Sequence, residues 1–258
     1  MRPVEICLNT DNLNFLKHNV EMVYAAGAAR IELCSNMQAD GLTPSVEAIK
    51  IARKAFNERK GLLVMIRPRS GDFFYDESEI IVMLAQIKQA AAAGANGVVF
   101  GVLMKNTNAE SCLNIVSLEK LIHLSKSLGL QVSIHRAFDA IKDRQLALTQ
   151  LIELGVERIL TSGLLWGSKG SAIDGLPTLS KLVNKANNQI EIVIAGGICV
   201  NKAKIINQTL MEECLVSNRN VQNQRHTFSF HAYSSVLTEA RIVIETVRGL
   251  VNLKICKQ

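Results

Sequence analysis

Short runs of branched apolar residues alternate with longer segments of helical periodicity along this chain of 258 residues. Eight runs have the length and composition of strands, and each is followed by a helix-like segment or a return loop. They are residues 4–8, 30–34, 62–68, 97–101, 131–138, 157–162, 190–196 and 227–232. Strands that alternate with helices form parallel sheets, and eight such units in about 250 residues match one closed barrel. The sequence therefore predicts an α/β fold, with a single (β/α)₈ TIM-like barrel domain over residues 1–258.

No sequence feature divides the chain into two domains. It contains no Gly/Ser-rich or Pro-rich linker and no low-complexity tract. A doubly wound sheet is the alternative architecture, but the motif GxGxxG is missing after the first predicted strand. Residues 207–226 are polar and lack a clear period, so we expect an irregular insertion before the last strand.

Two predicted helix starts carry capping signals. Asp76 and Glu79 fit the pattern D-x-x-E of a capping box before an apolar run. Thr43 and Pro44 fit an N-cap residue followed by proline at the first helical position. We therefore expect one helix to begin at each of these places.

Composition and charge narrow the classes of function. The net charge is +6 at pH 7, and part of the excess lies in residues 218–226 and in the tail. Aromatic residues do not interleave these basic segments, so we expect no nucleic-acid partner. No apolar run reaches the length of about 18 residues that a membrane span needs, and the N-terminus does not look like a signal peptide. We expect a cytoplasmic protein without a membrane partner, whose six cysteines are reduced.

Side chains alternate across a strand, so each predicted strand has one side facing the helices and one facing the barrel interior. Apolar positions such as Val4, Ile6 and Leu8 are expected to pack against the helices. The inward positions, together with residues that end the strands, form the predicted pocket: Glu5, Glu32, Arg67, Arg69, His135, Thr161 and His231. Because these side chains converge from several strands, we expect a functional pocket at the barrel mouth. The alternative is that they are polar core residues that pair with one another and have no function in binding or catalysis.

The third predicted strand runs into the stretch MIRPRSGDFFYD, in which Arg67 and Arg69 flank a proline. Buried charges need partners, and two arginines would balance Glu5 and Glu32. Guanidinium groups are also suited to holding an anion through two hydrogen bonds. We therefore expect both arginines in the pocket as substrate-binding residues.

The fifth predicted strand ends in the motif HRAFD, which gathers three groups with acid, base or anion-binding chemistry. His135 is followed there by Arg136 and Asp139. Glu32, His135 and Asp139 are the catalytic candidates, with His135 or Glu32 as the general acid or base. Arg136 is expected to bind substrate.

The seventh predicted strand ends in IAGGI, with Gly196 and Gly197 as its glycine pair. Loops after the seventh and eighth strands of barrels often bind phosphate through backbone N–H groups. We expect the pair to contribute to substrate binding, although a plain turn explains it equally well.

Cys7 and Cys34 occupy the same position in a Glu-x-Cys pattern that the first two predicted strands share. Neighbouring strands lie about 4.8 Å apart, so inward thiols at matched heights can share one soft metal ion. Two thiolates select Cu(I) over hard cations and are too few for a structural zinc site. The pattern predicts a Cu(I) site, and the alternative is that both cysteines pack as small hydrophobes.

Six segments together resemble, in order and spacing, the CutC family of copper homeostasis proteins. They are RIELCS (30–35), DGLTPS (40–45), MIRPRSGDFFY (65–75), GANGVVFGVL (94–103), VSIHRAFD (132–139) and RILTSG (158–163). The resemblance runs from about residue 4 to about residue 200. The last quarter of the chain departs from the family's pattern.

The resemblance implies a TIM-like barrel in the cytoplasm that takes part in copper handling by binding Cu(I). At the matching positions, Cys7 and Cys34 are the copper-ligand candidates. The pocket residues that it implies are Glu32, Arg67, Arg69, His135, Arg136 and Asp139.

Two classes of function remain open at this point. One is a Cu(I)-binding protein, which the paired cysteines favour. The other is a barrel enzyme of unassigned reaction acting on a small anionic or phosphorylated substrate, which the ring of Glu, Arg and His favours. The expected partners are a copper ion and a small anionic ligand, and assembly with further copies of the chain stays open.

Overall fold

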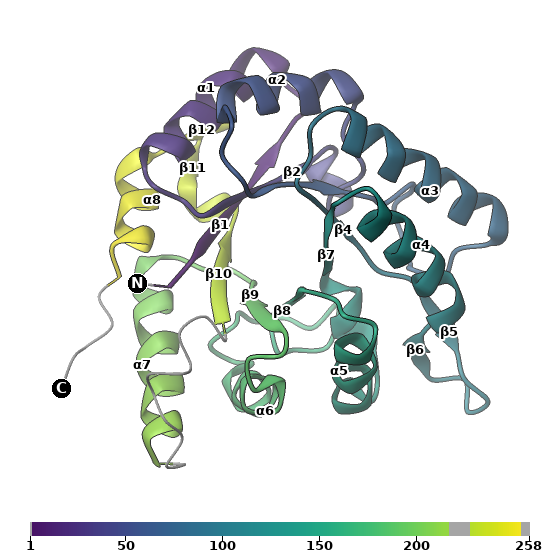
Figure 1. Cartoon of the computed structure of the whole chain (residues 1–258). Helices are drawn as coiled ribbons and strands as arrows, with labels where there is room; N and C mark the ends of the chain where they lie inside the picture. The colour runs from purple at the N-terminus through teal and green to yellow at the C-terminus, as the bar shows by residue number, and fades with distance from the viewer. Residues whose placement is uncertain (1, 217–227, 254–258) are drawn as a thin grey trace.

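Eight parallel strands close into a barrel in the computed structural model, which describes residues 2–216 and 228–253. Around the barrel, their order is β1-β10-β9-β8-β7-β4-β3-β2 (Figure 1). The strands are β1 (Val4–Asn9), β2 (Arg30–Cys34), β3 (Leu62–Met65), β4 (Gly97–Phe100), β7 (Gln131–Ile134), β8 (Arg158–Thr161), β9 (Glu191–Ile194) and β10 (Phe228–Ala232). All eight fall on predicted runs, and the predicted barrel is confirmed.

The helices lie outside the barrel and cover its strands (Figure 1). They are α1 (Leu13–Ala25), α2 (Val46–Phe56), α3 (Glu77–Ala92), α4 (Ile115–Ser127), α5 (Arg144–Glu153), α6 (Leu176–Ala186), α7 (Val200–Val216) and α8 (Ile244–Val251). Among the described residues, none of the helices has the length and apolar character needed to cross a membrane.

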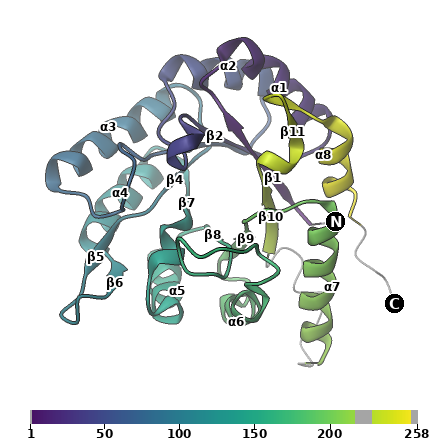
Figure 2. The same ribbon diagram turned by 180° about the vertical axis from the view of Figure 1, so that it is seen from behind.

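The loops that follow the barrel strands contain short elements that the sequence did not predict. They are the hairpins β5 (Leu103–Lys105) with β6 (Ser111–Leu113) and β11 (Leu237–Thr238) with β12 (Arg241–Ile242), and the 3₁₀ turns η1 (Met37–Ala39), η2 (Arg136–Ala140) and η4 (Ser234–Val236). Figure 2 shows the β5–β6 hairpin at the periphery, beside α4. Because these loops leave the carboxyl ends of the strands, they build the barrel mouth.

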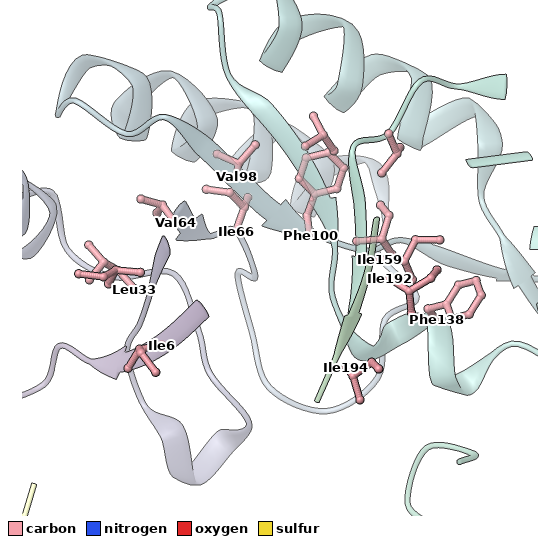
Figure 3. Packing of buried hydrophobic residues seen from close by; sticks show 14 of the residues in the cluster. Ile6, Leu33, Val64, Ile66, Val98, Phe100, Phe138, Ile159, Ile192 and Ile194 are labelled. Atoms are coloured by element: carbon pink, nitrogen blue, oxygen red, sulfur yellow. The ribbon is translucent and has the colours of Figure 1, made fainter. Parts of the chain in front are cut away.

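The main apolar core lies between the barrel and the helices. Ile6, Leu33 and Val64 alternate with inward residues on three neighbouring strands, and each is at most 1% exposed. Figure 3 shows these side chains with others of the same layer on later strands. Full burial of one such side chain is worth roughly 1.5–3 kcal/mol. The predicted apolar face of the strands is confirmed.

A layer of charged side chains fills the amino-terminal end of the barrel interior. Arg30, the first residue of β2, donates to Glu5 at 2.8 Å, to Glu191 at 2.7 Å and to Ser229 at 2.9 Å. Next to it, Arg158 donates through Nε to Ser133 at 3.0 Å. The partner of Glu5 is therefore Arg30, and the predicted pairing of Glu5 with Arg67 or Arg69 is wrong.

The expected irregular insertion over residues 207–226 is wrong for its first half, because residues 207–216 continue helix α7. Leu210 is 1% exposed, and the side chain of Asn207 accepts a hydrogen bond from Arg2 at 3.3 Å. The stretch looked like a loop because exposed positions of the helix, such as Gln208 and Glu212, are polar. Residues 217–226 lie outside the described part of the chain.

One of the two predicted caps is confirmed. Asp76 and Glu79 form the reciprocal capping box of α3. The N-cap of α2 is Ser45 rather than Thr43. The hydroxyl of Thr43 is engaged elsewhere, since it accepts from the backbone N–H of Arg67 at 2.8 Å.

Candidate functional site

A cavity of about 230 Å³ opens at the carboxyl end of the barrel. Seven of the predicted site residues line it: Cys7, Glu32, Cys34, Arg67, His135, Arg136 and His231. They come from β1, β2 and β10 and from the segments that follow β3 and β7. The site therefore lies where barrels of this architecture place their ligand and catalytic sites.

The two predicted copper ligands meet in this pocket. The Sγ atoms of Cys7 and Cys34 lie 3.7 Å apart, and both residues are 1% exposed. In the β1–β2 register, Cys7 lies opposite Glu32 and Cys34 lies opposite Asn9. The thiols are thus diagonal neighbours rather than neighbours at matched height. The stagger of strands in a barrel allows this diagonal approach.

The two thiols differ in acidity because they share one hydrogen bond. This bond lowers the pKa of Cys7 to about 6, against the effect of burial and with help from His231. The same bond, together with burial, raises the pKa of Cys34 well above its usual range. The arrangement therefore suits a Cys7 thiolate that accepts a hydrogen bond from the Cys34 thiol.

His231 connects the charged layer to the pocket. Its Nδ1 lies 3.0 Å from Glu5 and its Nε2 lies 3.6 Å from Glu32. Burial opposes its charged form, but the charge of Glu32, together with interactions with Cys7 and Glu5, raises the pKa of His231 well above its usual value. Burial likewise opposes the charge on Glu5, yet His231 and Arg30 lower the pKa of that carboxyl to about 2. Glu5 and His231 therefore form a buried ion pair below the pocket.

Glu32 has an incompletely satisfied carboxyl group. Burial raises its pKa well above the usual value. Its Oε1 atom is buried and has no hydrogen-bond partner among the described residues. One ligand atom of Glu32 lies within 4.8 Å of the thiols of Cys7 and Cys34, a spacing that suits a shared metal ion. Glu32 is thus a candidate metal ligand as well as a candidate acid.

His135 is a neutral imidazole at the edge of the pocket. Its Nδ1 accepts from the backbone N–H of Ala137 at 3.1 Å, so the proton of the neutral ring lies on Nε2. Burial, with the positive charge of Arg67, lowers the pKa of His135 to about 3. Nε2 has no hydrogen-bond partner among the described residues. His135 therefore has one spare donor.

Arg67 ties together the loops that follow β2 and β3. Its guanidinium donates to the carbonyl oxygens of Ala39 at 2.6 Å, Gly41 at 3.2 Å and Gly71 at 2.8 Å. The side chain is 2% exposed, and its guanidinium carbon lies 5.1 Å from the centre of the Phe73 ring. Arg67 thus shapes the pocket wall, and only its Nε atom lacks a partner within the described structure.

Asp139 is fully buried and acts as a hydrogen-bond hub. Its carboxylate accepts from the hydroxyl of Thr161, from the backbone N–H and the hydroxyl of Ser162, and from Arg136 Nε at 2.9 Å. Both carboxylate oxygens therefore already accept hydrogen bonds from the protein, whereas a general base needs an oxygen that can accept a proton from the substrate. The geometry gives Asp139 the role of positioning Arg136, whose guanidinium lies over the Trp166 ring.

Six predicted site residues do not line the cavity: Glu5, Arg69, Asp139, Thr161, Gly196 and Gly197. Arg69 instead pairs with Asp72 and Glu79 on the rim. The prediction extended strand alternation beyond Met65, where β3 ends, and proline at position 68 cannot continue a ladder. Gly196 and Gly197 adopt positive φ in the turn after β9, and the carbonyl of Gly196 accepts from Ala172 at 3.0 Å.

The remaining lining residues were not among the predicted site residues, although Met65 was expected to face the barrel interior. They are Met37, Asp40, Met65, Phe73, Leu160, Trp166 and Tyr233. Met37 carried a usable signal, because it follows Cys34 by three residues in CSNM and thioethers bind soft metals. Tyr233 directly follows β10, in the loop where the mouth was expected.

A closed (β/α)₈ barrel with buried thiols and ionisable groups at its carboxyl end defines a TIM-barrel protein with a candidate site at the barrel mouth. The model of the CutC family matches residues 3–219. The chain belongs to the CutC family.

Two relatives give the degree of similarity. A family protein CutC from Vibrio campbellii is 39% identical over 226 residues, which cover 87% of this chain and 85% of the relative. A family protein CutC from Pasteurella multocida is 38% identical over 217 residues, with coverages of 84% and 82%. The resemblance noted in the sequence motifs is confirmed.

Solved structures agree with the fold. A candidate copper homeostasis protein CutC from Streptococcus agalactiae superposes with a TM-score of 0.69 at 29% identity, covering 90% of this chain and 98% of that one. The 2-keto-3-deoxy-6-phospho-gluconate aldolase from Zymomonas mobilis has a TM-score of 0.57 at 15% identity, with coverages of 98% and 94%. The aldolase shares the fold only.

Proposed function

We propose that this protein binds Cu(I) through the thiolates of Cys7 and Cys34 and takes part in copper homeostasis in the cytoplasm. The observation that carries the proposal is the 3.7 Å separation of two buried Sγ atoms inside the mouth pocket. The description of the Streptococcus agalactiae relative as a candidate copper homeostasis protein supports it. So does the free state of the described cysteines, which suits a reducing compartment.

The donor set favours Cu(I) over other common metals. Thiolate and thioether sulfur are soft ligands that select Cu(I), whereas Mg²⁺ and Ca²⁺ require several oxygens. Zn²⁺ prefers four tetrahedral ligands. Glu32 is the carboxyl group that lies within 4.8 Å of both thiols, and burial favours its neutral form. The pocket therefore offers a low-coordinate sulfur site.

Metal analysis of the protein purified without oxygen tests this proposal. We expect roughly one Cu(I) per chain after loading and removal of excess copper by gel filtration, because one pair of thiols serves one ion. Zn²⁺ should be displaced by stoichiometric Cu(I). Failure to retain copper against a weak chelator would refute the proposed function.

A second candidate function is an enzyme acting on a small anionic substrate in the same pocket. The observation that favours it is the spare Nε2–H of His135 beside Arg67, whose Nε is also unpaired in the described structure. A neutral imidazole held by Ala137 can donate to a substrate oxygen without changing its charge. In this function, Glu32 and His135 are the candidates for proton transfer.

Anion-dependent stability tests the second candidate. Sulfate or phosphate should stabilise the fold, by about 2.7 kcal/mol at a hundredfold excess over Kd. The variant His135→Asn should lose most of this effect, because the shorter asparagine can replace Nδ1 but not Nε2–H. His123→Asn, which changes an exposed histidine on α4, is the matched control. Equal anion dependence in all three proteins would remove His135 from the binding site.

A further inference from the structure

Four sulfur-containing residues gather on one side of the pocket. Cys7, Cys34 and Met65 form a buried cluster, and Met37 and Tyr233 pack against it. The Sγ of Cys7 lies 3.7 Å from the Sγ of Cys34 and 3.9 Å from the Sδ of Met37. Cys7 therefore stands between a second thiol and a thioether.

The loop that carries Met37 is held in a defined conformation. Met37 opens the turn η1, and the flanking residues Asn36 and Asp40 both adopt left-handed backbone angles, with φ of 44° and 61°. Such angles cost free energy in residues other than glycine and persist where contacts impose them. Here the N–H of Asn36 donates to the carboxylate of Asp11 at 2.9 Å, and Arg67 donates to Ala39 at 2.6 Å. Met37 is thus presented by a loop that is anchored on both sides.

Gly41 shows how closely this loop approaches the thiols. It adopts φ of +84°, and a Cβ at this position would lie 3.3 Å from Cys34 Cβ, 3.4 Å from Cys34 Sγ and 3.5 Å from Met37 Sδ. One point beside the backbone therefore lies within 3.5 Å of sulfur atoms from both residues. A side chain there would be strained and would crowd the two sulfurs. The glycine lets the loop close over the cluster.

From this geometry we infer that Met37 is a third sulfur ligand, so that the metal site is a Cys7–Cys34–Met37 site specific for Cu(I). The inference rests on the proposed function, since it adds a ligand to the copper site formed by the two cysteines. A thioether binds Cu(I) well, whereas zinc sites in proteins are built from thiolate, imidazole and carboxylate. Met37 accordingly sets selectivity, and the cysteines supply most of the affinity.

The test compares Met37→Leu with Met22→Leu, a matched change of a partly buried methionine that lies on α1 and does not line the pocket. In anaerobic competition against bicinchoninate, Met37→Leu should bind Cu(I) at least about tenfold more weakly, since loss of even an outer-shell partner commonly costs about 10–100-fold. Met22→Leu should change the Cu(I) affinity by less than about tenfold, the smallest loss expected for a group that supports the metal. Zn²⁺ affinity should be the same in both variants, so that only the Cu(I)/Zn²⁺ ratio of Met37→Leu falls.

X-ray absorption at the copper edge tests the same ligand without relying on affinity. In selenomethionine-labelled protein, we expect a copper–selenium contact in the unchanged chain and in Met22→Leu. Met37→Leu should lack it. Copper bound with no selenium neighbour in the unchanged chain would overturn the inference and leave the cysteine site standing. A chain that binds no Cu(I) at all would overturn both.

Discussion

Replacing either Cys7 or Cys34 with serine is expected to reduce bound Cu(I) from about one ion per chain to nearly none. Serine keeps the size of the side chain but replaces a soft thiolate with a hard hydroxyl that does not bind Cu(I) at neutral pH. The two Sγ atoms lie 3.7 Å apart, so each serine variant leaves a single thiol where the proposed site needs a pair. The affinity should fall by at least about 100-fold, the upper range for loss of a supporting group.

Two other cysteines provide the controls. Cys112 lies on the β5–β6 hairpin and Cys199 lies just before α7, and neither lines the pocket. Cys112→Ser and Cys199→Ser should therefore bind copper like the unchanged chain. Binding should also strengthen as pH rises, because Cu(I) must displace the proton of Cys34, whose pKa is raised. Unchanged stoichiometry in Cys7→Ser or Cys34→Ser would exclude that cysteine from the site.

The second large effect concerns stability, and it should follow from Arg30→Met. The guanidinium of Arg30 is buried between the carboxylates of Glu5 and Glu191 and also donates to Ser229. Its removal takes the guanidinium partner from both carboxylates, and Glu5 keeps only its ion pair with His231. Breaking a buried ion pair in this way costs about 3–5 kcal/mol. Urea denaturation monitored by far-UV circular dichroism measures the loss.

Two further variants separate charge burial from packing in this experiment. Arg69→Met removes an arginine from ion pairs on the exposed rim and should cost no more than about 1 kcal/mol. The double variant Arg30→Met with Glu191→Gln should recover part of the loss, because it also removes the carboxylate charge that Arg30 had paired. An Arg30→Met chain within about 1 kcal/mol of the unchanged protein would contradict the assigned role of the charged layer.

The eight barrel strands could be predicted because their signal is local. A run such as residues 190–196 combines branched apolar residues with a glycine pair, and β9 lies within it. The proximity of Cys7 and Cys34 could be predicted from the alternation of side chains along each strand, which places both thiols inside the barrel. Both predictions needed only the period of a strand and the closure of a barrel.

The rest of the pocket could not be predicted because it is built by loops. Arg69 was predicted to face the pocket from the alternation of side chains along a strand. That alternation applies only within a strand, and β3 ends at Met65. Met37 and Tyr233 enter the pocket through turns whose direction depends on contacts far along the chain, such as the bonds from Arg67 to Ala39 and Gly41. Loop direction is a tertiary property, and strand periodicity carries no information about it.

Closure of the barrel between β1 and β10 has a consequence for the order of events during synthesis. The ion pair of Glu5 and His231 joins residues 226 positions apart, so the floor of the pocket is completed by the last barrel strand to leave the ribosome. At about 5–20 residues per second, Cys7 and Cys34 emerge roughly 10–40 s before His231. A nascent chain therefore exposes both thiols before their pocket exists. In the proposed copper site, shielding of the two thiols from solvent therefore depends on the finished barrel, in which all eight strands are present.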